Sequence, residues 1–280
     1  MLEQLYSAKF LKEKPAYAFL LGVAYSAIGI GAALLLFPQD PALISVLIIS
    51  VLFLPSLYKL SRMEEREELK EKGIFQAIIR QKQFIKVYFY AFFGMLVTFA
   101  FFSTILPSLA SNFLFKQQLA ILGNSGGAVF SSGLFLGLLI NNFKVMLLCF
   151  SVSLFFGNGS IFLIAWNASV WGTIFGNIAK AGALFAGKNP LIYLVLVLIS
   201  VLPHVILEVG SYIFATISGA EISEGTLREK FGSSRMQRLL YINLVILLLA
   251  IIILLFGASV ETFVLNNFET YRTIISQAFG

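Results

Sequence analysis

Long apolar runs constrain this chain more than any other feature of its sequence. Several reach about 20 residues, enough for a helix to cross the ~30 Å hydrocarbon core of a bilayer. The backbone of a spanning segment finds no water to bond in lipid, so such segments form helices. The alternating ~10-residue segments of a transmembrane barrel do not occur in the sequence. We therefore predict an all-α, polytopic bundle of transmembrane helices.

Composition and length favour one integral membrane domain over residues 1–280. The chain is 59% hydrophobic and 12% charged, whereas a soluble domain carries about 25% charged residues. Its longest polar stretch, about residues 59–86, is too short to bury a core of its own. We expect about seven spans, within a range of six to eight. They are 15–37, 42–58, 87–107, 141–157, 160–179, 190–218 and 239–258.

Basic residues predict the orientation in the cell membrane, because Lys and Arg concentrate in cytoplasmic loops. Fifteen of the 20 basic residues lie in three segments: before the first span, between spans two and three, and before the last span. With seven spans all three segments face the cytoplasm, so the N-terminus is predicted to be cytoplasmic and the C-terminus outside.

Residues 110–140 are ambiguous, because their Gly-rich NSGGAVFSSGLFLG stretch has the composition of a further span. Counting it would move the last basic loop to the outside, against the charge rule. We therefore expect an outer loop followed by an interfacial or re-entrant helix near 125–140. The three spans of residues 1–107 form an N-terminal part with a charged connector at 59–86, either a docking surface or a solvated linker helix.

One predicted span, VLISVLPHVILEVGSYIF, contains Pro203, His204 and Glu208. His204 is the only histidine in the chain, and Glu208 is the only acidic residue in any predicted span. A charged side chain in a membrane helix costs ~2.5–3.5 kcal/mol and usually faces the bundle interior. The spacing i, i+4 places His204 and Glu208 on one helix face, where they could share a hydrogen bond or a proton. Pro203 predicts a kinked, broken or re-entrant helix.

Asn142 and Asn167 lie in the preceding spans and are candidates for the same intramembrane polar site. Asn167 and Glu208 fall near mid-depth, so we expect contact between them. Two interpretations stay open for the site. It is a structural network that pins the helices, at roughly 0.6 kcal/mol per hydrogen bond, or it is a proton relay or substrate site.

Two GxxxG patterns, Gly133 with Gly137 and Gly172 with Gly176, predict close helix packing. Glycine at this spacing lets two helix backbones approach. The pattern fits a homo-oligomer seam, but packing within one chain is favoured because a seven-helix bundle offers many internal seams.

The sequence argues against an enzyme. One histidine cannot fill a zinc site, which usually takes three protein ligands, and Cys149 is the single cysteine. Neither Ser200 nor Ser211, the serines nearest His204 in the sequence, lies in a GxSxG context, and no HExxH or phosphate-binding glycine loop occurs. We expect no catalytic residue, metal or cofactor. The net charge of +6 reflects orientation and the lipid bilayer as partner, and nucleic acid is not expected because no basic patch joins a soluble module.

The order of these polar residues resembles the stage II sporulation protein M family, an integral membrane family of unknown function. The resemblance rests on Asn-Asn at 141–142, Asn167, and PHVILE at 203–208, and covers about residues 130–258. It implies a membrane component of a complex with peptidoglycan-remodelling enzymes, acting as a scaffold without known catalysis. Val205 departs from the glycine that the family pattern has after the histidine, and a valine there does not allow the close backbone approach that glycine permits.

Three functions follow as hypotheses. The first is a non-enzymatic scaffold or organiser of a membrane complex, with protein partners or further copies of the chain. The alternative is a small-solute or proton-coupled transporter or channel that uses the buried pair His204 and Glu208. The third is an intramembrane enzyme with Glu208 as acid or base.

Overall fold

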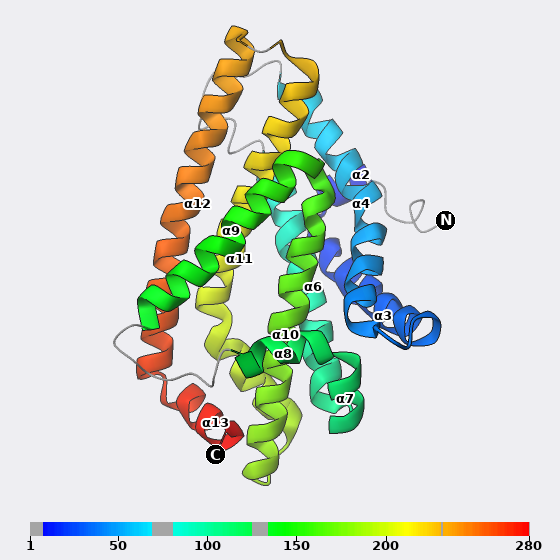
Figure 1. Ribbon diagram of the computed structural model, residues 1–280, viewed down its shortest axis with the longest axis vertical. Coiled ribbons are helices and arrows are strands. Elements are labelled where there is room, and N and C mark those ends of the chain that lie inside the picture. The colour runs from blue at the N-terminus through cyan, green and yellow to red at the C-terminus, as the bar shows by residue number, and fades with distance from the viewer. Residues whose placement is uncertain (1–7, 69–80, 125–133, 231, 280) are drawn as a thin grey trace.

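The computed structural model describes residues 8–68, 81–124, 134–230 and 232–279, with side chains at 62–68, 122–124 and 134 excepted. Every regular element in these ranges is a helix (Figure 1). They are α2 (Ala8–Glu13), α3 (Tyr17–Leu36), α4 (Pro41–Glu68), α6 (Lys82–Ile105), α7 (Ser108–Leu114), α8 (Lys116–Asn124), α9 (Leu134–Phe156), the 3-10 turn η1 (Gly157–Ser160), α10 (Ile161–Phe185), α11 (Pro190–Arg228), α12 (Ser234–Asn267) and α13 (Glu269–Phe279). The prediction of an all-α membrane bundle is confirmed.

Six helical segments of the described chain are long and apolar enough to cross a membrane. The fourth, Phe135–Phe185, contains both α9 and α10, and the chain reverses between them at η1 (Figure 1). Gly157 allows this reversal, because its φ of +56° lies in the left-handed region that side chains disfavour. The seven predicted spans thus correspond to α3, α4, α6, α9, α10, α11 and α12.

The region before α9 differs from the expectation. Residues 108–124 form the short helices α7 and α8, and residues 125–133 lie outside the described part of the chain. Residues 134–140 are the first turns of α9 and do not form a separate interfacial or re-entrant helix. The run LFLGLLI continues into the next apolar stretch without a proline, so one long helix propagates through both.

Helix α11 is continuous over 39 residues, although Pro203 lies within it. The helix is therefore not broken at Pro203. Pro203 and Ile199 are both exposed, so the backbone carbonyl that proline leaves unbonded lies on the outer side of the helix. The opposite side, with His204 and Glu208, is buried. Asn189 starts the helix, since its side chain accepts a hydrogen bond from the Leu191 N–H at 2.9 Å.

Close contact between α10 and α6 shows what the second GxxxG pattern does. A Cβ added at Gly172 would lie 2.4 Å from the Leu96 carbonyl oxygen, and one at Gly176 would lie 2.4 Å from the Ala100 oxygen. The contact joins two helices of one chain. Gly137 differs, since a Cβ there would meet nothing within 4 Å, and Gly133 lies outside the described residues.

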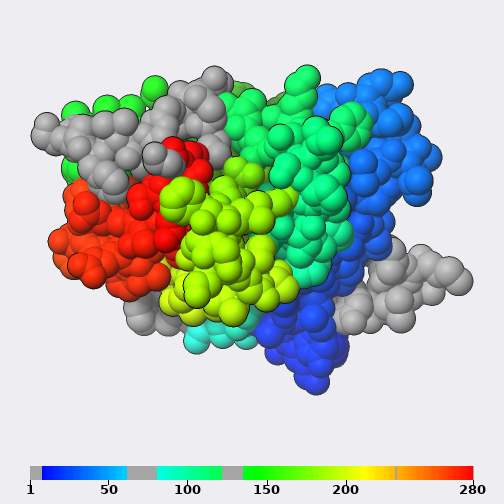
Figure 2. All heavy atoms as spheres, turned by 90° about the horizontal axis from the view of Figure 1, so that it is seen from below, coloured from blue at the N-terminus to red at the C-terminus, as the bar shows by residue number. Residues whose placement is uncertain are grey.

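The bundle has two unlike ends. At one end, α13 packs beside α10 and closes the lower surface (Figure 2). The Tyr193 hydroxyl donates to Gln277 at 3.1 Å, which ties α13 to the start of α11. At the other end, the hairpin of α11 and α12 extends beyond the other helices (Figure 1).

Candidate functional site

The inner face of α11 carries the candidate site. His204 and Glu208 lie one helical turn apart, and they are 5% and 3% exposed. Helices α9, α10 and α12 each pack against α11. Pro203 precedes His204 in the sequence and lies on the exposed side of α11. Its apolar ring faces outward, whereas the polar side chains of His204 and Glu208 are buried.

The carboxyl group of Glu208 joins three helices. It forms side-chain hydrogen bonds with Glu261 of α12 and with Asn142 of α9. Asn142 is 7% exposed, and its amide is the donor to the carboxyl. We call these residues and His204 the polar seam: Asn142, His204, Glu208 and Glu261.

A hydrogen bond between two carboxyl groups needs a proton on one of them, since an ionised carboxylate only accepts. Among the described residues, no Lys or Arg forms an ion pair with Glu208 or Glu261. Two uncompensated negative charges would be costly in a low-dielectric interior. The geometry of the polar seam is therefore that of a carboxylic acid paired with a carboxylate or with a second acid.

His204 is not hydrogen-bonded to Glu208 in the described structure. Its Nδ1 atom is buried without a partner, as are Oε1 of Glu208 and Oε2 of Glu261. The expected hydrogen bond between His204 and Glu208 is replaced by bonds from Glu208 to the neighbouring helices.

Asn167 does not join the polar seam. Its side chain is half-buried on α10 and donates to the Leu163 carbonyl oxygen at 2.8 Å, within its own helix. Similar depth in two neighbouring spans placed Asn167 near Glu208 in the sequence-based expectation. Depth alone says nothing of the direction in which a side chain points around its helix.

The sequence model of the family described as Stage II sporulation protein M matches residues 87–264 of this chain, more than half of its 280 residues. The chain belongs to the stage II sporulation protein M family. The resemblance predicted from residues 130–258 is confirmed, and the match extends it through α6 and most of α12. Comparison with curated proteins and with solved structures gave no match.

The part that matches the stage II sporulation protein M family contains the whole polar seam, including Glu261. Sequence reasoning missed Glu261, because the last span was predicted to end at residue 258, whereas α12 continues to Asn267. A usable signal was present. Gly257 and Glu261 share the i, i+4 spacing of one helix face, and apolar residues follow in the run FVL.

Gly257 sets the distance between the two helices that carry the carboxyl groups. A Cβ at this position would lie 3.2 Å from Cγ of Glu208 and 3.3 Å from Cβ of Leu207. The missing side chain therefore lets α12 lie directly against Glu208. One turn further along α12, Glu261 then reaches the same carboxyl group.

Aromatic and small polar groups border the polar seam. Tyr212 is 1% exposed one turn beyond Glu208, and its ring centroid lies 6.1 Å from that of Trp171. Cys149 of α9 is buried. At the α13 side, burial raises the pKa of Tyr271 far above its ordinary value, and the negative charge of Glu261 adds to this effect.

A second polar cluster lies nearer the other end of α11. The Ser61 hydroxyl donates to Glu224 at 3.0 Å, and the Gln81 amide donates to Glu221. These bonds fasten the end of α4 and the start of α6 to α11. The described residues contain no group of three or more His, Cys, Asp or Glu side chains that could hold a metal ion.

Proposed function

We propose that this member of the family is a non-enzymatic membrane protein that organises a membrane complex through the projecting end of α11 and α12. We call residues 218–230 and 232–243 the hairpin tip. The observation that carries the proposal is the length of its two helices. At ~1.5 Å per residue, the 39 residues of α11 and the 34 of α12 reach about 58 Å and 51 Å, well beyond a ~30 Å hydrocarbon core.

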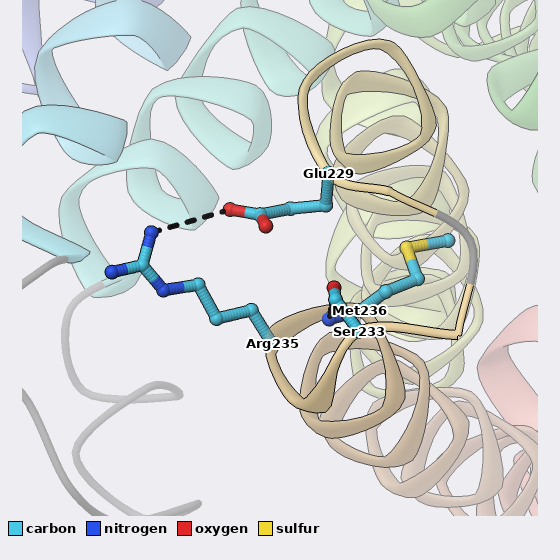
Figure 3. Close-up of polar contacts among 4 residues, drawn as sticks. All are labelled: Glu229, Ser233, Arg235 and Met236. Atoms are coloured by element: carbon cyan, nitrogen blue, oxygen red, sulfur yellow. Dashed lines mark hydrogen bonds and ion pairs between the residues drawn. The ribbon is translucent and has the colours of Figure 1, made fainter.

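The hairpin tip is held as a defined shape, which a docking element needs. Figure 3 shows Ser233 at the start of α12, where its hydroxyl accepts a hydrogen bond from the Met236 N–H at 3.1 Å. Arg235 and Glu229 approach to 3.8 Å across the turn. Deeper in the hairpin, the Ser218 hydroxyl donates to the Asn243 carbonyl oxygen at 2.8 Å.

The surface of the hairpin tip suits contact with another protein. Leu227 is 85% exposed, and the side chain of Arg235 is 73% exposed. An apolar side chain among cations offers both a buried contact and charge steering. By the positive-inside rule we expect these cations, and with them the hairpin tip and the N-terminus, on the cytoplasmic side, and α13 outside.

Site-specific photocrosslinking in cells tests the scaffold proposal. A photoreactive residue at Leu227 is expected to give a defined adduct with a partner protein. The same residue at Ile252, which is 50% exposed on the membrane part of α12, is the matched control and is expected to give lipid adducts. Leu227→Glu is expected to reduce co-purification of that partner at least tenfold without changing the amount of the chain. Adducts that are equal at both positions would contradict the proposal.

A proton-coupled transporter is the second candidate, favoured by the carboxyl groups of the polar seam, of which Glu208 is buried and Glu261 half-buried. Intramembrane acids that face a bundle interior commonly serve proton or substrate pathways. Proton uptake into proteoliposomes is then expected for the wild type and is expected to be lost in Glu208→Gln. Background uptake by both proteins across a broad panel of solutes would exclude transport and leave the scaffold proposal standing.

A further inference from the structure

We propose that Glu208 and Glu261 form a proton-binding site that latches α12 to α11. The proposal does not depend on whether the protein acts as a scaffold or as a transporter. It starts from the hydrogen bond between the two carboxyl groups, which one proton makes possible and without which two negative charges would face each other.

The surroundings make this bond a binding site for a proton. Glu208 is 3% exposed, and one oxygen of each carboxyl is buried without a partner. His204, 5% exposed on the same face of α11, adds a buried Nδ1 atom without a partner. The bond from Asn142 stabilises a negative charge on Glu208, so one charge and one proton can coexist in the pair.

The titratable groups around the pair are few. His204 and Tyr212 come from α11, Cys149 from α9, and Tyr271 from α13. Tyrosine and cysteine are neutral at physiological pH in such surroundings, so they supply no countercharge. Lys144 of α9 is exposed, and Lys180 of α10 donates to the Leu106 carbonyl oxygen instead. A proton is therefore the simplest cation that balances the pair.

The site couples proton binding to helix packing, because its two carboxyl groups belong to different helices. Gly257 keeps α12 against Glu208, with no side chain to fill the gap if the helices separate. Release of the proton as pH rises leaves two like charges in contact across this seam. The end of α12 that carries Glu261 then moves away from α11.

Infrared difference spectroscopy on the full chain in nanodiscs tests proton binding directly, because a protonated carboxyl has its own C=O stretching band. The wild type is expected to show the band of a buried acid at neutral pH and to lose it as pH rises. The double variant Glu208→Gln, Glu261→Gln is expected to lack the band. Glu269→Gln changes an exposed carboxyl on α13 and is expected to retain it.

Three outcomes would overturn proton binding. The first is a wild type without the acid band at neutral pH, and the second is a band that persists in the double variant. The third is a band that sodium removes at constant pH, which would make the site one for a metal cation. Glutamate labelled with carbon-13 shifts the band of the wild type, so the assignment to glutamate does not depend on variants that must fold.

Spin labels test the latch. Ile199 on α11 and Phe263 on α12 are 62% and 63% exposed, so cysteine labels there leave the interior intact. In a Cys149→Ser background, the distance between the labels is expected to increase as pH rises. In the double glutamine variant the distance is expected to stay constant, since an amide can donate where the proton was. A wild-type distance that does not change with pH would overturn the latch.

Discussion

At the scale of single residues, the polar seam shows how one carboxyl group organises three helices. A membrane interior offers Glu208 few hydrogen-bonding partners, and its carboxyl group bonds the side chains of Glu261 and Asn142. The latter two come from helices far apart in the chain. Buried polar groups of this kind favour one packing arrangement, because every alternative arrangement leaves them without partners.

Asn142 and Asn167 form a natural comparison. Asn142→Leu removes the amide donor to Glu208, and we expect the free energy of unfolding to fall by about 1–3 kcal/mol, the usual cost of an unsatisfied buried group. Asn167→Leu removes only a bond within its own helix and is expected to cost less than half as much. Unfolding of both variants in detergent gives the comparison, and equal losses would show that Asn142 does not support Glu208.

At the scale of helices, small residues decide which elements touch. Gly172 and Gly176 bring α10 onto α6, and Gly219 brings α11 onto α9, where a Cβ would lie 2.4 Å from the Phe150 oxygen. These contacts pack backbone against backbone. Without a hydrophobic driving force between helices in lipid, such close van der Waals packing holds a bundle together.

We therefore expect the stability of the protein to respond differently to alanine substitutions in the two GxxxG patterns. Gly172→Ala adds a methyl group where the Leu96 carbonyl oxygen already lies, and we expect a loss of about 1–3 kcal/mol, typical of overpacking. Gly137→Ala adds the same group in open space and is expected to leave stability unchanged or slightly higher, as alanine favours helix. Thermal unfolding in detergent measures both. A large loss at Gly137 would instead reveal a contact with another molecule.

At the scale of the whole molecule, α11 is the axis of the bundle. Its lower part meets α13, its middle carries the polar seam, and its upper part forms the hairpin tip (Figure 1). The site for a proton and the surface proposed for partners therefore lie on one continuous helix, which offers a direct mechanical connection between them.

The orientation of the whole bundle is predicted by the charge rule. Ser234→Cys in the hairpin tip is expected to be protected from a membrane-impermeant maleimide in intact cells, and Ser276→Cys on α13 is expected to react. Cys149 is buried and should give little background. Permeabilised cells provide the control in which both cysteines react. Reaction of Ser234→Cys in intact cells would show that the predicted orientation is wrong.

The sequence by itself determined the class of fold, most of the spans and the family, because these depend on local runs of apolar residues and on short motifs. It also predicted that His204 and Glu208 lie on one helix face, which follows from helix geometry alone. The sequence did not predict that α12 extends past residue 258. An acidic residue near the end of a helix cannot be distinguished, from the sequence alone, from one in a polar segment after the helix.

The tertiary structure alone decided which groups meet. Glu208 pairs with Glu261 because the turn between α11 and α12 and the close contact at Gly257 fix how far the two helices slide past each other. Asn142 reaches the pair and Asn167 does not, because the rotation of each helix about its own axis follows from packing against its neighbours. Register and rotation are properties of the packed bundle, and no single segment of the sequence contains them.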